Sequence, residues 1–247
     1  VGDLTRIFLT SLETKHVKKK PTIAVQLRYL MGTNFGLGKE VLPKEFSLVH
    51  GRLNIVDAKE FLQNPSNLLK LFQLSLKSKS LIHPEALRLV AGNLELIDEN
   101  FKNSPENNKN FLDLLLNYDS PEKALRHMNE VGILGAFIPE FGRIVAMMQF
   151  NMYHSYTVDE HTIQCIHNLS EIEHGKLHED LPIASEILEG DINRKILYVA
   201  LLLHDIGKGL PEDHSKIGAK IARRLAPRLG LKSEECETVE WLIENHL

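Results

Sequence analysis

The apolar stretch Ile196–Leu203, with the sequence ILYVALLL, most constrains what this chain can fold into. It is far shorter than the roughly 20 residues that cross a bilayer, so it has to be buried inside the protein. The polar pair His204-Asp205 follows at once, and Lys208 comes shortly after. A carboxylate at the margin of a core is costly unless a cation accompanies it. The stretch therefore predicts a buried helix that carries a histidine and an aspartate to the mouth of the core.

Helical periodicity dominates the rest of the chain. Apolar residues recur at intervals of three and four, and Thr157-x-x-Glu160 is typical of a capping box. A proline-marked loop is predicted at 102–108. Residues 45–58 are the exception. Apolar and polar side chains alternate on both sides of a His50-Gly51 turn, and this pattern predicts a β-hairpin. The predicted class is all-α with one small hairpin, and helices are expected at 3–16, 64–78, 83–101, 108–118, 120–134, 157–173, 192–205, 214–230 and 233–247.

Composition excludes several classes of protein. The formal net charge of -4 gives no signature of nucleic-acid binding. Cys165 and Cys236 are far apart and form no CxxC motif, so we expect reduced thiols, as in a cytoplasmic protein. The chain shows no signal-peptide pattern and no apolar segment of membrane-spanning length, so no membrane association is expected.

Four histidines and one aspartate form a candidate metal site. Each candidate histidine lies at a helix terminus or beside apolar helix positions, which predicts convergence on one place. Imidazole and carboxylate ligands together suit zinc, manganese, iron or cobalt. The predicted ligands are His161, His204, Asp205, His214 and His246. The predicted catalytic residues are His204, Asp205, Lys208 and His214. Lys208 is expected either to bind a phosphate oxygen, a contact that His214 could make instead, or to neutralise charge in the transition state.

Two further features of the sequence lie close to these residues. His154 precedes the Thr157 cap and could approach the site from a loop. The polar stretch 171–193 is long enough to form a flap beside the site. The other histidines have polar neighbours and are interpreted as ordinary surface residues: His16, His50, His83, His127, His167, His174 and His178.

The order of these motifs resembles the HD-domain superfamily of metal-dependent phosphohydrolases. The resemblance rests on His161 in DEHTIQ, His204-Asp205 in LLHDIGKG, His214 in DHSKIGA and His246 in ENHL. Residues 128–162 look like the family of bifunctional PII uridylyltransferase/uridylyl-removing enzymes of bacterial nitrogen control. The hairpin and the NPSNLLKLF segment are similar to the linker that follows the transferase domain in that family.

The resemblance implies a helical linker over 1–141 and an HD-type domain over 142–247, which we expect to be truncated at its C-terminus. It implies hydrolysis of a phosphodiester bond by metal-activated water, with the uridylylated PII protein as substrate and UMP as product. Manganese or magnesium is the family's usual ion, and iron, zinc or nickel occur in HD relatives.

The chain departs from the family pattern in two ways. The Gly-Ser pair of the transferase domain is missing from the chain, so no uridylyl transfer is expected. A further aspartate that usually completes the HD metal shell one helix downstream is also missing.

Three alternatives stay open on the sequence. The chain could be an HD hydrolase of a nucleotide or a nucleotide second messenger. It could be a nucleotide-sensing or regulatory module without turnover. Its histidines could simply be core and cap residues of a helical bundle.

Overall fold

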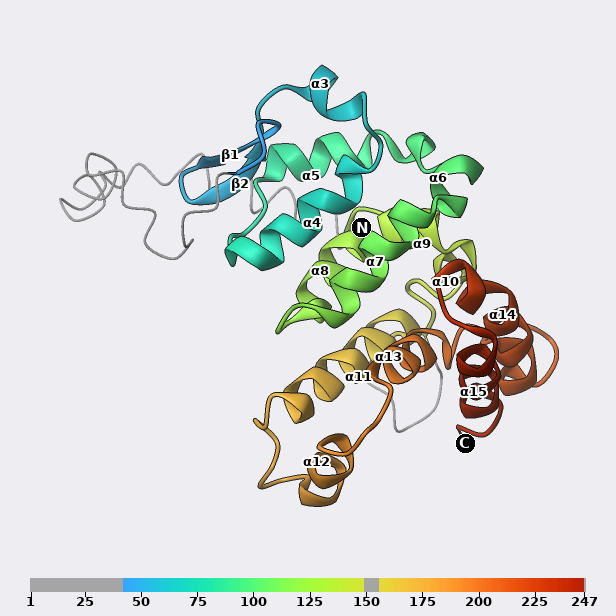
Figure 1. The fold of residues 1–247 in the computed structure, drawn as a ribbon. Helices are drawn as coiled ribbons and strands as arrows, with labels where there is room; N and C mark the ends of the chain where they lie inside the picture. Colours follow the sequence, from blue (N-terminus) through green and yellow to red (C-terminus); the bar gives the residue numbers. More distant parts are fainter. Residues whose placement is uncertain (1–41, 149–155, 247) are drawn as a thin grey trace.

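The computed structural model describes residues 42–148 and 156–246. The described chain is helical apart from one two-stranded sheet, which confirms the predicted all-α class (Figure 1). The helix expected at 3–16 and the candidate His154 lie outside the described residues.

The predicted hairpin is present and begins the described fold. Strands β1 (Phe46–Val49) and β2 (Arg52–Ile55) pair in antiparallel register. His50 and Gly51 both have positive φ, 52° and 77°, as a two-residue type I′ turn requires. The sheet buries one face, where the ring of Phe46 meets that of Phe61 edge to face at 5.7 Å.

Short helices follow the hairpin and build the first half of the core. Gly92 ends a helix and splits the predicted segment 83–101 into separate pieces. The loop predicted at 102–108 is wrong, because Ser104 caps a new helix that starts at once with Pro105. The elements are α3 (Ala58–Leu62), α4 (Asn67–Ser78), α5 (Pro84–Ala91), η1 (Leu94–Leu96), α6 (Glu99–Asn103), α7 (Pro105–Leu116), α8 (Pro121–Glu130), α9 (Ile133–Phe137) and α10 (Pro139–Gly142).

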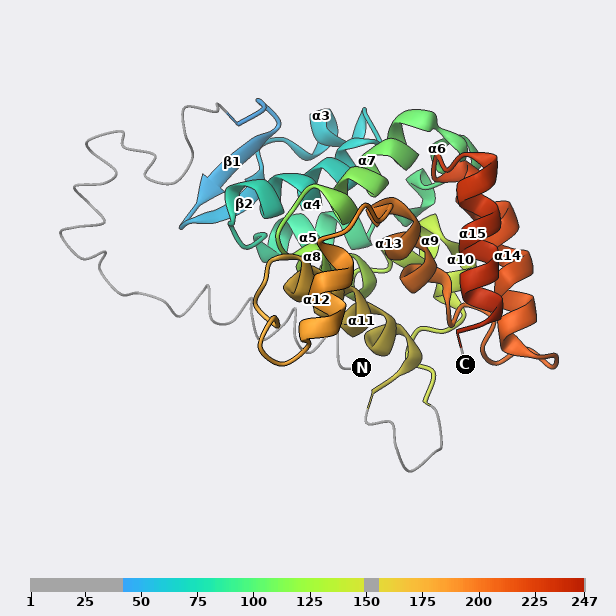
Figure 2. The same ribbon diagram turned by 60° about the horizontal axis from the view of Figure 1, so that its bottom comes forward.

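The helices α11 to α15 form the second half, with α13 at their centre. Helix α13 packs against α11, α14 and α15 and reaches α7 of the first half. Helices α14 and α15 lie side by side at one end, and α12 lies at the other (Figures 1 and 2). The elements are α11 (Val158–Glu173), α12 (Pro182–Leu188), α13 (Arg194–Leu203), α14 (His214–Arg228) and α15 (Ser233–Glu244).

Small residues set the close packing of α14 on α15. The buried face of α14 carries Gly218, Ala219, Ala222 and Ala226, so the α14 backbone approaches its neighbours closely. A β-carbon at Gly218 would lie 3.1 Å from Ile243 of α15. Leu225 is buried as the sequence predicts, whereas Ile217 and Ile221 are only half-buried.

The two halves share one continuous hydrophobic core. Arg228 of α14 donates to the Phe137 carbonyl at 3.0 Å and stacks over the Phe137 ring. Arg126 of α8 donates to Glu160 of α11 at 2.9 Å. These contacts cross the boundary predicted at 141/142, which stays a prediction.

Two local predictions around α11 are wrong. Thr157 begins the helix but its side chain makes no capping hydrogen bond, because Glu160 is bound by Arg126 instead of turning back to the cap. The polar stretch 171–193 contains α12 and packs at the C-terminal end of α11. That end is about 18 Å along the helix axis from His161, so the stretch forms no flap over the site.

Within the described residues, no helix combines the length and apolar composition needed to cross a membrane.

Candidate metal centre

The site begins where α13 ends. Asn193 caps the start of this helix by accepting from the backbone amides of Lys195 and Ile196. Most of the run from Tyr198 to Leu203 is buried, so the following His204 and Asp205 emerge from the core at a fixed position. Asp205 is 1% exposed, which makes it a buried carboxylate that requires cationic or hydrogen-bonding partners.

Gly207 folds the chain back so that α14 can join the site. A β-carbon on Gly207 would overlap the carbonyl oxygen of His214 and lie 2.8 Å from the Gly218 amide nitrogen. Glycine is therefore required at this position for the turn to pack against the start of α14. Asp213 caps α14 by accepting from the Ser215 amide at 3.0 Å, which sets His214 at the first helical position.

Four imidazoles and Asp205 come together from four helix ends or faces. The Nε2 atoms of His161, His204 and His246 lie 3.9, 3.2 and 3.6 Å from carboxylate oxygens of Asp205. The rings form a row, with centroid separations of 5.5 Å for His161–His204, 5.3 Å for His204–His246 and 5.6 Å for His214–His246. The structure thus brings together all five residues that the sequence nominates as ligands.

Backbone carbonyls orient two of these rings. His204 Nδ1 is 2.7 Å from the Leu201 oxygen, and His246 Nδ1 is 2.6 Å from the Ile243 oxygen. A carbonyl only accepts, so both Nδ1 atoms carry a proton, and the Nε2 atom of each ring faces Asp205. This arrangement is the one that metal-binding histidines adopt.

His214 supplies a further donor without a partner. Its Nε2 is buried and makes no hydrogen bond among the described residues. Burial lowers the pKa of His214, which favours the neutral, ligand-competent form. Ligand atoms of Asp205, His214 and His246 all lie within 4.8 Å of one another, so the donor set fits a divalent cation.

Lys208 neutralises Asp205 in this structure. Its ammonium donates to Asp205 Oδ2 at 2.8 Å, from a side chain that is itself largely buried. Burial alone would raise the pKa of Asp205, but His204 and Lys208 outweigh it and hold the pKa well below its usual value. The carboxylate is therefore ionised and available as a ligand at neutral pH.

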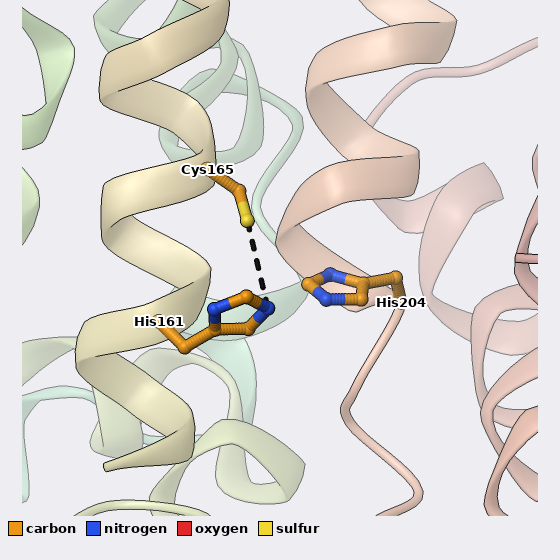
Figure 3. Close-up of side chains that lie close together, drawn as sticks. All are labelled: His161, Cys165 and His204. Atoms are coloured by element: carbon orange, nitrogen blue, oxygen red, sulfur yellow. Dashed lines mark hydrogen bonds between the residues drawn. The ribbon is translucent and has the colours of Figure 1, made fainter. Parts of the chain in front are cut away.

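Cys165 is a member of the cluster that the sequence analysis missed. Its Sγ lies 3.6 Å from His161 Nε2, and a second group of potential ligands within 4.8 Å comprises His161, Cys165 and His204 (Figure 3). The available signal was the spacing, because residues four apart share one face of a helix.

A buried carboxylate positions the helix that carries His161. Asp159 accepts from Asn129 Nδ2 at 2.7 Å and from the Ala146 amide at 3.2 Å. Ala146 has a positive φ of 56°, so this segment is held in an uncommon conformation by the same carboxylate. These contacts tie the first turn of α11 to α8.

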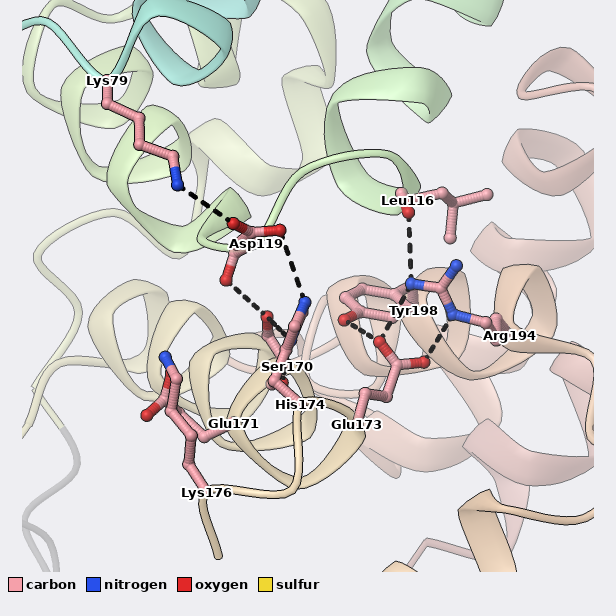
Figure 4. Close-up of polar contacts among 10 residues, drawn as sticks. All are labelled: Lys79, Leu116, Asp119, Ser170, Glu171, Glu173, His174, Lys176, Arg194 and Tyr198. Carbon is pink, nitrogen blue, oxygen red and sulfur yellow. Dashed lines mark hydrogen bonds and ion pairs between the residues drawn. The ribbon is translucent and has the colours of Figure 1, made fainter. Parts of the chain in front are cut away.

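The opposite end of α11 carries a separate polar network (Figure 4). Tyr198 of α13 donates to Glu173 at 2.7 Å, and Arg194 donates to both oxygens of the same carboxylate. Arg194 also reaches the Leu116 carbonyl of α7 at 3.1 Å. The network joins three helices and is structural, since Glu173 lies about three helical turns along α11 from His161.

Two protein-family models match the sequence of this chain. The HD domain model matches residues 158–247, which include α11 to α15 and all five nominated ligands. Residues 158–247 are thus similar to the HD domain. The HD domain is preceded by a match of residues 46–137 to the model described as "Uridylyltransferase GlnD third domain".

Two relatives align with the whole chain. Both are named bifunctional uridylyltransferase/uridylyl-removing enzyme, and they come from Cereibacter sphaeroides and Ruegeria pomeroyi. They are 58% and 57% identical to this chain over 247 residues. The chain spans 26% of the length of each of these curated relatives.

The HD match bears on the metal site and on the domain boundary. An HD domain implies a divalent metal ion, and the cluster of histidines around Asp205 has the chemistry to bind one. The two family matches leave residues 138–157 unassigned, so they do not test the boundary predicted at 141/142.

Proposed function

We propose that this chain is the uridylyl-removing part of a bifunctional uridylyltransferase/uridylyl-removing enzyme. The reaction is hydrolysis of the phosphodiester bond that links UMP to the PII regulatory protein. The observation that carries the proposal is the convergence of three imidazole Nε2 atoms on the buried carboxylate of Asp205. Similarity over the whole of this chain to part of two enzymes named for uridylyl removal supports this substrate.

His161, His204 and Asp205 would hold a divalent ion, and His214 and His246 would complete its surroundings or hold a second ion. When bound, the ion supplies Lewis-acid activation of water and charge stabilisation at the phosphoryl group. The Asp205 carboxylate is ionised at neutral pH. The Leu201 and Ile243 carbonyls hold the rings of His204 and His246 so that their Nε2 atoms face this carboxylate.

Lys208 would bind a non-bridging phosphate oxygen of the substrate. Its ammonium is 14% exposed and already lies at the carboxylate. Once an ion takes over the neutralisation of Asp205, Lys208 is free to turn its charge toward the phosphate, where it stabilises the developing negative charge. Both cysteines are free thiols, in keeping with a cytoplasmic location.

Metal content tests the centre directly. Protein purified without chelator is analysed for elements beside the double variant H204A/D205A and the control H178A, whose histidine is exposed and remote. We expect one or two equivalents of a transition metal in wild type and H178A, and none in the double variant. Stoichiometric metal in the double variant would overturn the ligand assignment.

Substrate identity needs a second assay. Wild-type protein is incubated with uridylylated PII and, separately, with a panel of nucleotides and cyclic dinucleotides. Release of UMP from PII alone supports the proposal. Hydrolysis confined to the free nucleotides would instead indicate another branch of HD hydrolases.

A further inference from the structure

Cys165 lies one helical turn beyond His161 on the face of α11 that looks toward α13. Figure 3 shows its side chain and the His161 ring directed into the same space, with the His204 ring opposite. The thiol is half-buried between the helices. Burial raises the pKa of the Cys165 thiol, so without a cation the group is a neutral thiol at physiological pH.

Ligand atoms of His161, Cys165 and His204 all lie within 4.8 Å of one another, which is close enough to share one ion. Zinc–sulfur and zinc–nitrogen bonds of about 2.3 and 2.0–2.1 Å at a tetrahedral angle put sulfur and nitrogen about 3.6 Å apart. The observed distance between Cys165 Sγ and His161 Nε2 is 3.6 Å. The same bond lengths place a nitrogen and a carboxylate oxygen about 3.4 Å apart, and His204 Nε2 lies 3.2 Å from Asp205 Oδ2.

We propose that Cys165 is a metal ligand that shares one ion with His161 and His204, whose ligand atoms lie within 4.8 Å of each other and of its sulfur. The inference rests on the proposed metal centre and extends it. On binding, the thiol proton passes to the buffer and the thiolate coordinates the ion. Sulfur is a soft ligand, which selects zinc or iron(II) over magnesium at this position.

Cobalt(II) gives a direct spectroscopic test of the sulfur ligand. The wild-type chain is loaded with cobalt in place of its native ion, beside C165S and the matched control C236S. Cys236 is buried in α15 and makes no contact with the cluster, since its sulfur lies against the Leu231 carbonyl. We expect a near-ultraviolet sulfur-to-cobalt charge-transfer band in wild type and C236S, and its loss in C165S with visible d–d bands retained.

The outcomes separate the two proposals. Visible cobalt bands without any charge-transfer band in wild type would overturn the role of Cys165 and leave the histidine–aspartate centre intact. A charge-transfer band retained in C165S would also overturn it. No cobalt binding in wild type would overturn both proposals.

X-ray absorption of the zinc-loaded wild type gives a check that needs no variant. We expect a sulfur scatterer at about 2.3 Å, and a shell of only nitrogen and oxygen would contradict the assignment. Competition titrations should show at least a tenfold loss of zinc affinity in C165S and no change in magnesium affinity. Equal loss for both ions would mean that the serine variant disturbs the site as a whole.

Discussion

Gly207 lies against the backbone carbonyl of His214 so closely that no other residue fits there without displacing the start of α14. The neighbouring atoms are backbone, which cannot swing aside as a flexible side chain would. G207A should therefore destabilise the fold by about 1–3 kcal/mol or more and weaken metal binding. Urea denaturation and metal titration measure the two effects.

The control for this prediction is G230A. Gly230 has a φ of +86° with open space around its β-carbon position. Alanine there should lower the stability only by the penalty of the left-handed conformation, about 1–2 kcal/mol. We expect unchanged metal affinity in G230A. Equal metal affinity in G207A and G230A would contradict the role given to Gly207.

Asp159 positions His161, so its removal should reach the site indirectly. D159A leaves the Asn129 amide and the Ala146 amide without their acceptor, which should cost about 1–3 kcal/mol. We expect weaker metal binding as well, because His161 is in the same helical turn. D159N keeps one carbonyl acceptor and should fall between wild type and D159A in thermal denaturation. If D159A were as stable as wild type, Asp159 would not position the first turn of α11.

Tyr198 offers a test at the opposite end of α11. Y198F removes the hydrogen bond from its hydroxyl to Glu173, a charged acceptor, and should cost about 1.5–3 kcal/mol of folding stability. Metal stoichiometry should stay unchanged, since the network in Figure 4 is remote from His161. A loss of metal in Y198F under native conditions would show that the two ends are coupled.

Glu235 should make the docking of α15 sensitive to acid. Burial disfavours its charged form, but hydrogen bonds from Lys195, the Lys232 amide and Asn193 outweigh burial and lower its pKa to about 2. A pKa lowered on folding stabilises the protein above the usual value of 4.5, and that contribution is lost as pH falls toward about 2.

The variant E235Q measures this contribution. We expect wild type to exceed E235Q in stability by about 1–2 kcal/mol at pH 7, with the difference closing between about pH 4.5 and pH 2. Urea denaturation at pH 7, 5 and 3 gives the profile. If the stability difference between wild type and E235Q grew on acidification, the predicted direction of the pH dependence would be wrong.

Lys208 and a metal ion compete for the same carboxylate oxygen. K208Q removes the competing charge, so metal binding should tighten. Hydrolysis should nevertheless fall at least tenfold if Lys208 contacts the phosphate. K216Q, with an exposed lysine on α14, serves as the control and should change neither quantity. Weaker metal binding in K208Q would mean that the lysine supports the site only structurally.

The sequence predicted the helices around the site well because their signals are local. The apolar run ending at Leu203 and the alternation around His50 each determine one element without reference to the rest of the fold. The five nominated ligands could be found because each lies at a helix end or beside buried positions. Cys165 was missed because a cysteine four residues after a histidine is informative only once α13 is known to face it.

Two local predictions failed for different reasons. The capping box at Thr157 does not form, and Glu160 instead binds Arg126 of α8, a partner far away in the sequence. The expected flap could have been excluded from the spacing alone, because 171–193 follows the end of its helix that lies about 18 Å from His161.

The donors around Asp205 come from α11, from the turn after α13, from the start of α14 and from the second residue after α15. These helix ends are far apart in the sequence, so an ion bound among their donors acts as a cross-link between them. Because the ion binds the assembled helices and not the separated ones, it opposes their local opening. The supply of metal in the cell therefore sets how firmly this bundle stays closed.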